Sequence, residues 1–220
     1  MPRAAWNRHL TAAIALAATL AAAPAFAQTL RFGLAEDPDV LDPTLARTFV
    51  GRIVFASLCD KLFDIDDKLN IVPQLAESWQ WSADGKALTM KLRPGVTFHD
   101  GEKFDAAAVK FNIERHKTMA SPKAAQAAGD KFGANPVCSG PFKFVERVAQ
   151  DRIVLERYPN YWNKGAIHFD RIVFLPIVDA TVRLANLKSG QLDFIERVAA
   201  SDAAAVSSDS RFKLSKITEI

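Results

Sequence analysis

The sequence predicts a mixed fold, α/β or α+β, built as one lobe of ordinary globular composition. Two pairs of β-prone runs are each separated by a short polar turn, several helical stretches begin at capping residues, and strands and helices do not strictly alternate. That order is typical of a sheet with helices packed on it. About half of the 220 residues are hydrophobic, which is enough apolar material for a sizeable core.

The first segment, residues 1–27, has the pattern of a secretory signal peptide. Arg3 and Arg8 precede an alanine-rich apolar run, and a small-x-small tripeptide ends at Ala27. The alternative is a membrane anchor, but a proline interrupts the run before it reaches the roughly 20 residues that a bilayer requires. We therefore expect cleavage between Ala27 and Gln28 and a soluble, exported chain comprising residues 28–220.

Strands and hairpins are predicted in both halves of this chain. Residues 29–35 form a β-prone run, and Asp84-Gly85 supplies a turn between "WQW" and the alternating "LTMKL". Further on, "AQD" separates "FKFVERV" from "RIVLERY", which predicts a second hairpin, and the runs "RIVFLPIV" and "LDFI" follow as strands.

Helices are predicted where apolar residues recur at helical spacing behind a capping residue. Asp105 is suited to cap a helix in which Val109 and Ile113 belong to the inward stripe, and Asp179 is suited to cap another that ends near Gly190. Residues 44–58 carry apolar side chains at four-residue spacing and predict a largely buried helix. The members of that apolar face are Leu45, Phe49 and Ile53, with Val50, Val54 and Leu58.

The charge pattern argues against a nucleic-acid partner, and the cysteine content allows one disulfide bond. Basic and acidic residues nearly balance and are interspersed, without an aromatic-interleaved basic stripe, so no nucleic-acid partner is indicated. Cys59 and Cys138 are the only cysteines, and an exported chain matures where disulfides persist, so one bridge is plausible. The alternative is two buried free thiols that pack as small hydrophobic side chains.

Neither a catalytic site nor a metal site is indicated. The sequence lacks a nucleophile elbow, a P-loop and a dinucleotide-binding glycine motif. His99 and Asp100 are adjacent, so on an extended strand their side chains point to opposite faces, which is poor geometry for an acid–base pair. His99, His116 and His168 lack metal-ligand spacing. We therefore predict no enzyme activity, no metal and no cofactor.

Five aromatic residues could line a ligand cleft or pack within the fold. Aromatic side chains offer a large contact area with a polar tip, which suits a binding site. Trp79 and Trp81, however, stand two apart on one face of a strand, a spacing that suits packing on the lobe. We expect a structural role for all five, which are Trp79, Trp81, Tyr158, Tyr161 and Trp162.

Three ordered blocks of the sequence resemble the signature regions of family 5 extracellular solute-binding proteins. The first runs from "PQLAESWQWSADGKALTMKLRPGVTFHDGEKF" to "NIERH", the second is "NPVCSGPFKFVERVAQDRIVLERYPNYW", and the third is "FDRIVFLPIVDATVRLANLKSGQLDFI". Together they cover most of residues 28–220.

The resemblance implies a lobe like those of type II periplasmic binding proteins, which close on a ligand and serve ABC importers. Ligand favours the closed state of such proteins only by binding it better. The expected function is therefore a periplasmic, monomeric binding component that delivers a solute, most readily a dipeptide or oligopeptide, to the membrane permease. Nickel chelates, glutathione and opines are alternative ligands in the resembling family.

Two departures from the family pattern favour a second interpretation. Residues 116–120 run directly into Ser121-Pro122, where the family has a further strand and helix, and the chain stops near the start of the second lobe. A lobe without its partner is expected to expose sheet edges and apolar surface. The alternative function is therefore a truncated remnant that binds its ligand weakly or not at all.

For ligand contact, the resemblance points to the loop after the first strand. This loop reads Ala35-Glu36-Asp37-Pro38. Glu36 and Asp37 are the candidate binding residues, since a carboxylate there could accept a charge-assisted hydrogen bond from an α-ammonium group. A solvated acidic turn is the alternative, because the family's main ammonium-binding aspartate lies in a later region.

Overall fold

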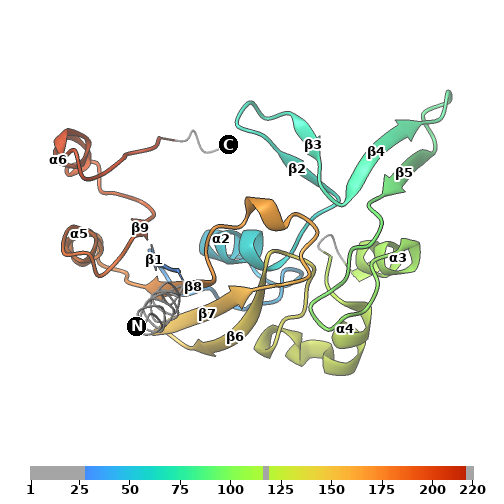
Figure 1. The fold of residues 1–220 in the computed structure, drawn as a ribbon, viewed down its shortest axis with the longest axis horizontal. Coiled ribbons are helices and arrows are strands. Elements are labelled where there is room, and N and C mark those ends of the chain that lie inside the picture. The colour runs from blue at the N-terminus through green and yellow to red at the C-terminus, as the bar shows by residue number, and fades with distance from the viewer. Residues whose placement is uncertain (1–27, 116–118, 217–220) are drawn as a thin grey trace, which may run out of the picture.

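A five-stranded sheet lies at the centre of the protein (Figure 1). The structure is a computed structural model that describes residues 28–115 and 119–216, so the predicted signal peptide lies outside the described residues. The strands of this sheet are β1 (Thr29–Leu34), β6 (Phe142–Val148), β7 (Arg152–Arg157), β8 (Arg171–Pro176) and β9 (Phe194–Ile195).

Two hairpins and five helices complete the described fold. The hairpins are β2 (Phe63–Ile65) with β3 (Ile71–Pro73), and β4 (Ala76–Trp81) with β5 (Leu88–Leu92). The helices are α2 (Phe49–Leu58), α3 (Ala106–Arg115), α4 (Pro122–Ala128), α5 (Ala180–Lys188) and α6 (Ala203–Ser208), with short 3-10 turns η1 (Gly129–Ala134) and η2 (Lys164–Ala166). The two hairpins predicted from the sequence, β4–β5 and β6–β7, are both present, and the mixed α/β class is confirmed.

The order of the strands in the central sheet is β6-β7-β8-β1-β9. β6, β7 and β8 pair antiparallel, whereas β1 pairs parallel with both β8 and β9. A connection between parallel strands of one sheet requires a crossover. Helix α5 provides it between β8 and β9, which lie on either side of β1. The first strand of the described chain therefore lies between two strands that are more than 130 residues later in the sequence.

The main core forms between α2 and the sheet. Val50, Val54 and Leu58 are fully buried and belong to the same apolar cluster as Leu34 and Phe174. Burying side chains of this kind contributes roughly 1.5–3 kcal/mol each relative to the exposed state. Val50, Val54 and Leu58, three members of the broad apolar face predicted for residues 44–58, therefore form the packing face.

The predicted start of this helix was wrong, and so was the burial of Leu45 and Phe49, whereas Ile53 packs partly buried against the main core. α2 begins at Phe49, because the backbone N–H groups of Leu45 and Ala46 donate instead to the carbonyl of Asp42 at 3.0 and 2.8 Å, forming a separate turn. Leu45 is 52% exposed as a result. The spacing in the sequence did not reveal that a preceding turn competes for these residues.

The predicted helix caps are present, although one buried position differs. Asp105 accepts a hydrogen bond from the backbone N–H of Ala108 at 2.9 Å, and Asp179 accepts one from Val182 at 2.9 Å. In α3 the buried side chains include Val109, but Ile113 is 56% exposed, so its inward placement was wrong. A ten-residue helix on the outside of a small cluster buries only a narrow stripe.

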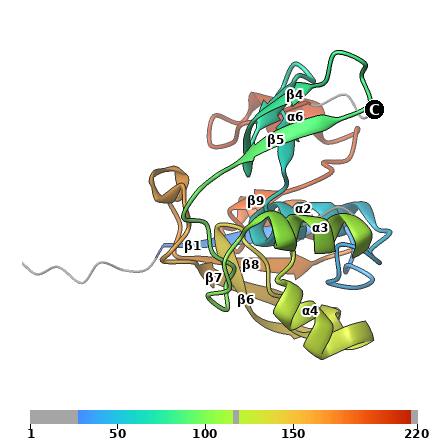
Figure 2. The ribbon, with the colours of Figure 1, turned by 90° about the vertical axis from the view of Figure 1, so that its right-hand side faces the viewer.

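The two hairpins, β2–β3 and β4–β5, project from the central sheet as an arm (Figure 1 and Figure 2). Several apolar side chains on this arm are exposed. Ile65, Ile71 and Trp81 are 62%, 63% and 57% exposed. Trp79 is partly covered by Phe63, with ring centroids 4.6 Å apart. The prediction that Trp79 and Trp81 pack on the lobe was therefore wrong: Trp79 is 37% exposed and contacts the other hairpin, and Trp81 is exposed. Each sheet of the arm has only two strands and leaves one face without a covering layer among the described residues.

A buried carboxylate joins this arm to the rest of the fold. Asp60, which precedes β2, is 1% exposed and accepts hydrogen bonds from Tyr161 Oη at 3.1 Å, Trp162 Nε1 at 2.7 Å and Gln74 Nε2 at 3.1 Å. The guanidinium of Arg93 lies over the Trp162 ring at 3.9 Å. The structural role predicted for Tyr161 and Trp162 is confirmed, since both side chains bind this carboxylate.

The sulfur atoms of Cys59 and Cys138 lie 2.01 Å apart, the separation of a disulfide. This places the residue after α2 against the segment that leads into β6. Gly140 allows the close approach, because a Cβ there would lie 2.5 Å from the carbonyl oxygen of Leu58. The bond joins residues 79 positions apart and stays a prediction that reduction can test.

Replacing both Cys59 and Cys138 by alanine is expected to lower the free energy of unfolding by about 2–5 kcal/mol, because the bond restricts a long loop in the unfolded chain. Urea unfolding measures the loss. Dithiothreitol should destabilise the native protein and leave the stability of the double variant unchanged. Equal stability of the native protein and the double variant in the absence of reductant would contradict the bond.

Asp60 and His99 are expected to affect stability in opposite directions between pH 4 and pH 6.5. Burial raises the pKa of Asp60 from 3.8 to about 6, against the hydrogen bonds from Trp162 and Tyr161, so its contribution is complete below pH 3.8 and is lost as pH rises through 6. Burial lowers the pKa of His99 from 6.5 to about 4, so its contribution is complete above 6.5 and is lost as pH falls toward 4.

The variant Asp60→Asn keeps an acceptor for Trp162 but removes one of these opposing contributions. Its stability should fall more steeply than that of the native chain between pH 7 and pH 4.5, by up to about 2 kcal/mol. The reason is that protonation of Asp60 stabilises the native chain only from its folded pKa of about 6 down to pH 4.5, and each pH unit corresponds to about 1.4 kcal/mol. Thermal unfolding at several pH values measures this. The exposed Asp67→Asn is the matched control, and parallel profiles for all three proteins would refute the assignment.

Candidate ligand-binding edge of the sheet

The parallel strands bring three chain segments to one edge of the central sheet. β8, β1 and β9 end at Pro176, Leu34 and Ile195 and run in the same direction. In open α/β sheets, ligands bind in the crevice outside such carboxyl ends. We call this region the carboxyl edge; it comprises the residues that directly follow these strands, Ala35–Asp37, Ile177–Val178 and Glu196–Arg197.

The short strand β9 is fixed against β1 by a charge-assisted pair. Arg31 donates through its backbone N–H and its Nε to Asp193 Oδ2 at 2.8 and 3.0 Å, and through Nη2 to Oδ1 at 2.7 Å. Gly33 of β1 permits the two strands to pack closely, since a Cβ at this position would lie 2.6 Å from the side chain of Leu192. Together these contacts set the position of Glu196, the first residue after β9.

Glu196 is a buried acid at the carboxyl edge. Its Oε1 accepts a hydrogen bond from the backbone N–H of Ala35 at 2.8 Å. Its Oε2 is buried and has no hydrogen-bond partner among the described residues, and the cation that contacts it is the Nε of Arg197 at 3.6 Å. The guanidinium of Arg197 also lies over the Phe49 ring, at 5.1 Å from the ring centroid. The carboxyl edge therefore contains an acceptor atom that the described fold does not use.

Arg183 of α5 holds the loops of this edge together. It is only 3% exposed, and its Nη1 donates to the carbonyls of Ile177 and Val178 at 2.6 and 2.8 Å. Its Nη2 donates to the carbonyl of Arg197 at 3.1 Å. One buried guanidinium thus fixes the ends of β8 and β9 relative to each other.

The two predicted binding residues occupy different surroundings. Asp37 turns toward the β6–β7 hairpin, where its Oδ2 accepts hydrogen bonds from Arg147 Nη2 at 3.0 Å and from the backbone N–H of Gln150 at 2.9 Å. Glu36 is half-buried at the carboxyl edge, and within the described residues no hydrogen bond or ion pair engages its carboxylate. Of the two, Glu36 is the one whose carboxylate stays available for a ligand, and its ligand role stays a prediction.

His99 and Asp100 do not form a functional pair. His99 Nε2 lies 3.0 Å from the Gly140 carbonyl, whereas Asp100 Oδ2 accepts from the hydroxyl of Ser121 at 2.6 Å. Tyr158 packs edge-on against the His99 ring at 4.9 Å and donates its hydroxyl to the Phe98 carbonyl at 2.8 Å. His99, Asp100 and Tyr158 therefore all have structural roles, as was predicted for Tyr158.

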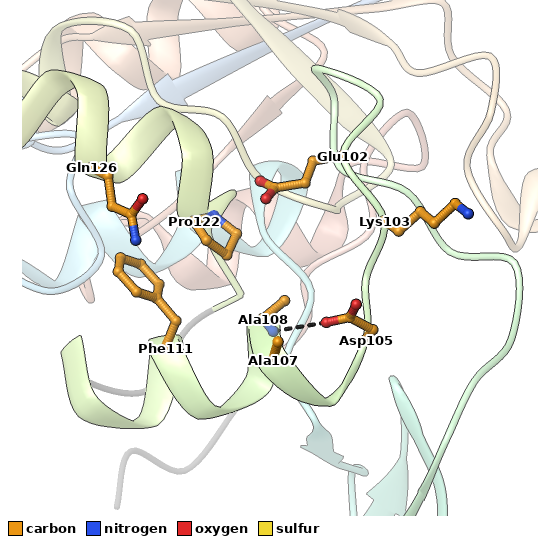
Figure 3. Close-up of a pocket in the computed structure, with 8 residues that line it drawn as sticks. All are labelled: Glu102, Lys103, Asp105, Ala107, Ala108, Phe111, Pro122 and Gln126. Atoms are coloured by element: carbon orange, nitrogen blue, oxygen red, sulfur yellow. Dashed lines mark hydrogen bonds between the residues drawn. The ribbon is translucent and has the colours of Figure 1, made fainter.

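A hollow of about 420 Å³ lies between α3, α4 and the loop before α3 (Figure 3). Its two carboxylates already have partners: Asp105 caps α3, and Glu102 Oε2 accepts from Ser121 Oγ at 2.7 Å and from the backbone N–H of Lys123 at 3.0 Å. We assign no ligand to this hollow. Among residues 28–115 and 119–216, no three side chains of the metal-binding types lie together as a metal site would require.

Comparison with known proteins decides the family. Residues 70–128 and 117–219 match the family described as bacterial extracellular solute-binding proteins, family 5 Middle. The chain belongs to this family. Family 5 proteins are transport binding proteins that bind small solutes and work with ABC permeases, so the prediction that this chain is not an enzyme is confirmed.

Individual family 5 relatives differ in what they bind. The glutathione-binding protein GsiB of Pectobacterium atrosepticum is 31% identical over 200 residues, 70% of this chain and 39% of the relative. The structure of AgaA from A. tumefaciens R10 in complex with agropinic acid is 26% identical with a TM-score of 0.76, covering 83% of this chain and 46% of that one.

A third similar protein supports the fold alone. The periplasmic binding protein DppA of Helicobacter pylori, solved in complex with peptide STSA, is 20% identical with a TM-score of 0.73, covering 83% of this chain and 49% of that one. This family 5 chain thus spans less than half the length of all three proteins. Within its described residues, no helix has the length and apolar character needed to cross a membrane.

Sequence reasoning missed Glu196 and Arg183. The available signal was the position of Glu196 directly after the predicted strand "LDFI", because carboxyl ends of parallel strands meet at one edge. That signal becomes usable only when β9 is known to pair with β1. Arg183 carries no signal, since one arginine within a helical run resembles any solvent-exposed charge.

The contacts of Asp37 predict a structural effect for its substitution. Asp37→Asn should lower the free energy of unfolding by about 1–3 kcal/mol, because it weakens hydrogen bonds to a partly buried charged group. Urea unfolding measures the change. Glu36→Gln alters the charge equally and should leave stability unchanged; a larger loss in Glu36→Gln would contradict these placements.

Proposed function

We propose that this chain is a periplasmic substrate-binding component of an ABC importer, that it binds a short peptide at the carboxyl edge, and that it presents the peptide to a membrane permease as a monomer. The observation that supports this most is its membership in family 5. A signal peptide over residues 1–27 is part of the proposal, because the chain would otherwise not reach the periplasm.

A peptide ligand is favoured by the relatives and by the chemistry of the edge. The Pectobacterium relative is described as binding glutathione, which is itself a peptide. The carboxyl edge offers acids at Glu36 and Glu196, and also the exposed guanidinium of Arg197. Groups of both signs suit a ligand that carries an ammonium and a carboxylate group.

Titration of the isotope-labelled chain with glutathione and with the dipeptide Ala-Leu tests this function. NMR chemical shifts detect saturable binding even when it is weak, and maltose serves as the negative control. The Pectobacterium glutathione-binding protein is the positive control. We expect saturable shifts in residues of the carboxyl edge, with lower affinity than the positive control, since this chain supplies less than half of that protein's length.

The competing possibility is that this chain binds no solute. It predicts that neither peptide shifts any resonance beyond the maltose control, while the labelled chain still gives the dispersed spectrum of a folded protein. That result would overturn the proposed function.

A further inference from the structure

The carboxylate of Glu196 has one oxygen more than its structural role requires. Its side chain is 8% exposed, and Oε1 alone accepts the hydrogen bond from the backbone N–H of Ala35. A glutamine in this position would accept the same bond without a charge. Burying a charged group costs free energy unless the charge is paired and hydrogen-bonded, and Oε2 has no hydrogen-bond partner among the described residues.

The cation beside this oxygen is held loosely. Arg197 Nε lies 3.6 Å from Glu196 Oε2, beyond hydrogen-bond distance, and the Arg197 side chain is 47% exposed. Contacts of exposed arginines contribute little to stability, so the guanidinium can move aside at small cost. The guanidinium already lies over Phe49, which is 37% exposed, at 5.1 Å from the ring centroid. This contact does not depend on Glu196, so Arg197 can keep it when another cation takes its place beside Oε2.

We propose that Glu196 receives the ammonium group of the solute, which replaces Arg197 as the partner of Oε2. The inference rests on the proposed function and names the residue that selects a ligand with a free amine. A primary ammonium has three donors on a compact charge, so it can reach a recessed oxygen that the planar guanidinium of Arg197 contacts only from 3.6 Å.

The surroundings of Glu196 are rigid enough for this role. Ala35 holds Oε1, and Arg183 fixes the carbonyl of the next residue, Arg197, at 3.1 Å. The Arg31–Asp193 pair anchors the other end of β9. An acceptor held in place before the ligand arrives loses little conformational entropy on binding.

The test compares free and N-acetylated glutathione on the native chain and on Glu196→Gln. We expect the substitution to weaken binding of glutathione roughly tenfold or more, the effect of losing a hydrogen bond to a charged group, and to leave binding of N-acetylglutathione unchanged. The amide resonance of Ala35 provides a direct readout, because its N–H donates to Glu196. It should shift when glutathione binds to the native chain.

Glu156→Gln is the matched control. Glu156 pairs with Lys143 on the surface and lies opposite Arg171, the first residue of β8, at the other end of the sheet. This control should bind glutathione as the native chain does. If Glu196→Gln weakens binding of glutathione and of N-acetylglutathione equally, or leaves glutathione binding undiminished, the role of Glu196 is overturned and the proposed function is not. Failure of the native chain to bind either ligand would overturn the proposed function and this inference together.

Discussion

The parallel pairing of β1 with β8 and β9 organises this fold. It places the first described strand between two strands from the far end of the chain, in registers that pair Thr29 with Arg171 and Phe32 with Phe194. Such contacts join residues far apart in the chain and incur a loop-closure entropy, so local sequence preferences do not specify them. The main core and the carboxyl edge both follow from this arrangement.

Acidic side chains illustrate how surroundings decide the role of one chemical group. Asp37 and Glu196 both follow strands of the parallel set, and each has one buried oxygen without a hydrogen bond among the described residues. The charge of Asp37, however, is already paired with Arg147 through a hydrogen bond of 3.0 Å, whereas Glu196 has only the loose contact with Arg197. Asp60 is buried away from this edge. Glu196 therefore combines the position with the spare capacity that ligand binding requires.

The hairpin arm shows the opposite relation between sequence and surroundings. Its strands and its Asp84-Gly85 turn follow local rules, because a polar turn with Gly85 at φ 68° favours a tight hairpin. Its burial does not follow local rules. Ile71 of β3 and Trp81 of β4 are large apolar residues of the kind that a core buries. In the described part of the fold, however, both side chains are exposed.

The hairpins and the caps at Asp105 and Asp179 could be predicted before the fold was known, because they depend on residues close together in the chain, and the family could be recognised from three sequence blocks. The burial of individual residues on the apolar face of α2, and the acids that meet at the carboxyl edge, could not. Both depend on strand register and parallel pairing, which arise from contacts across more than 130 residues. Glu196 reaches Ala35 across 161 residues, a separation at which no periodicity in the sequence carries information.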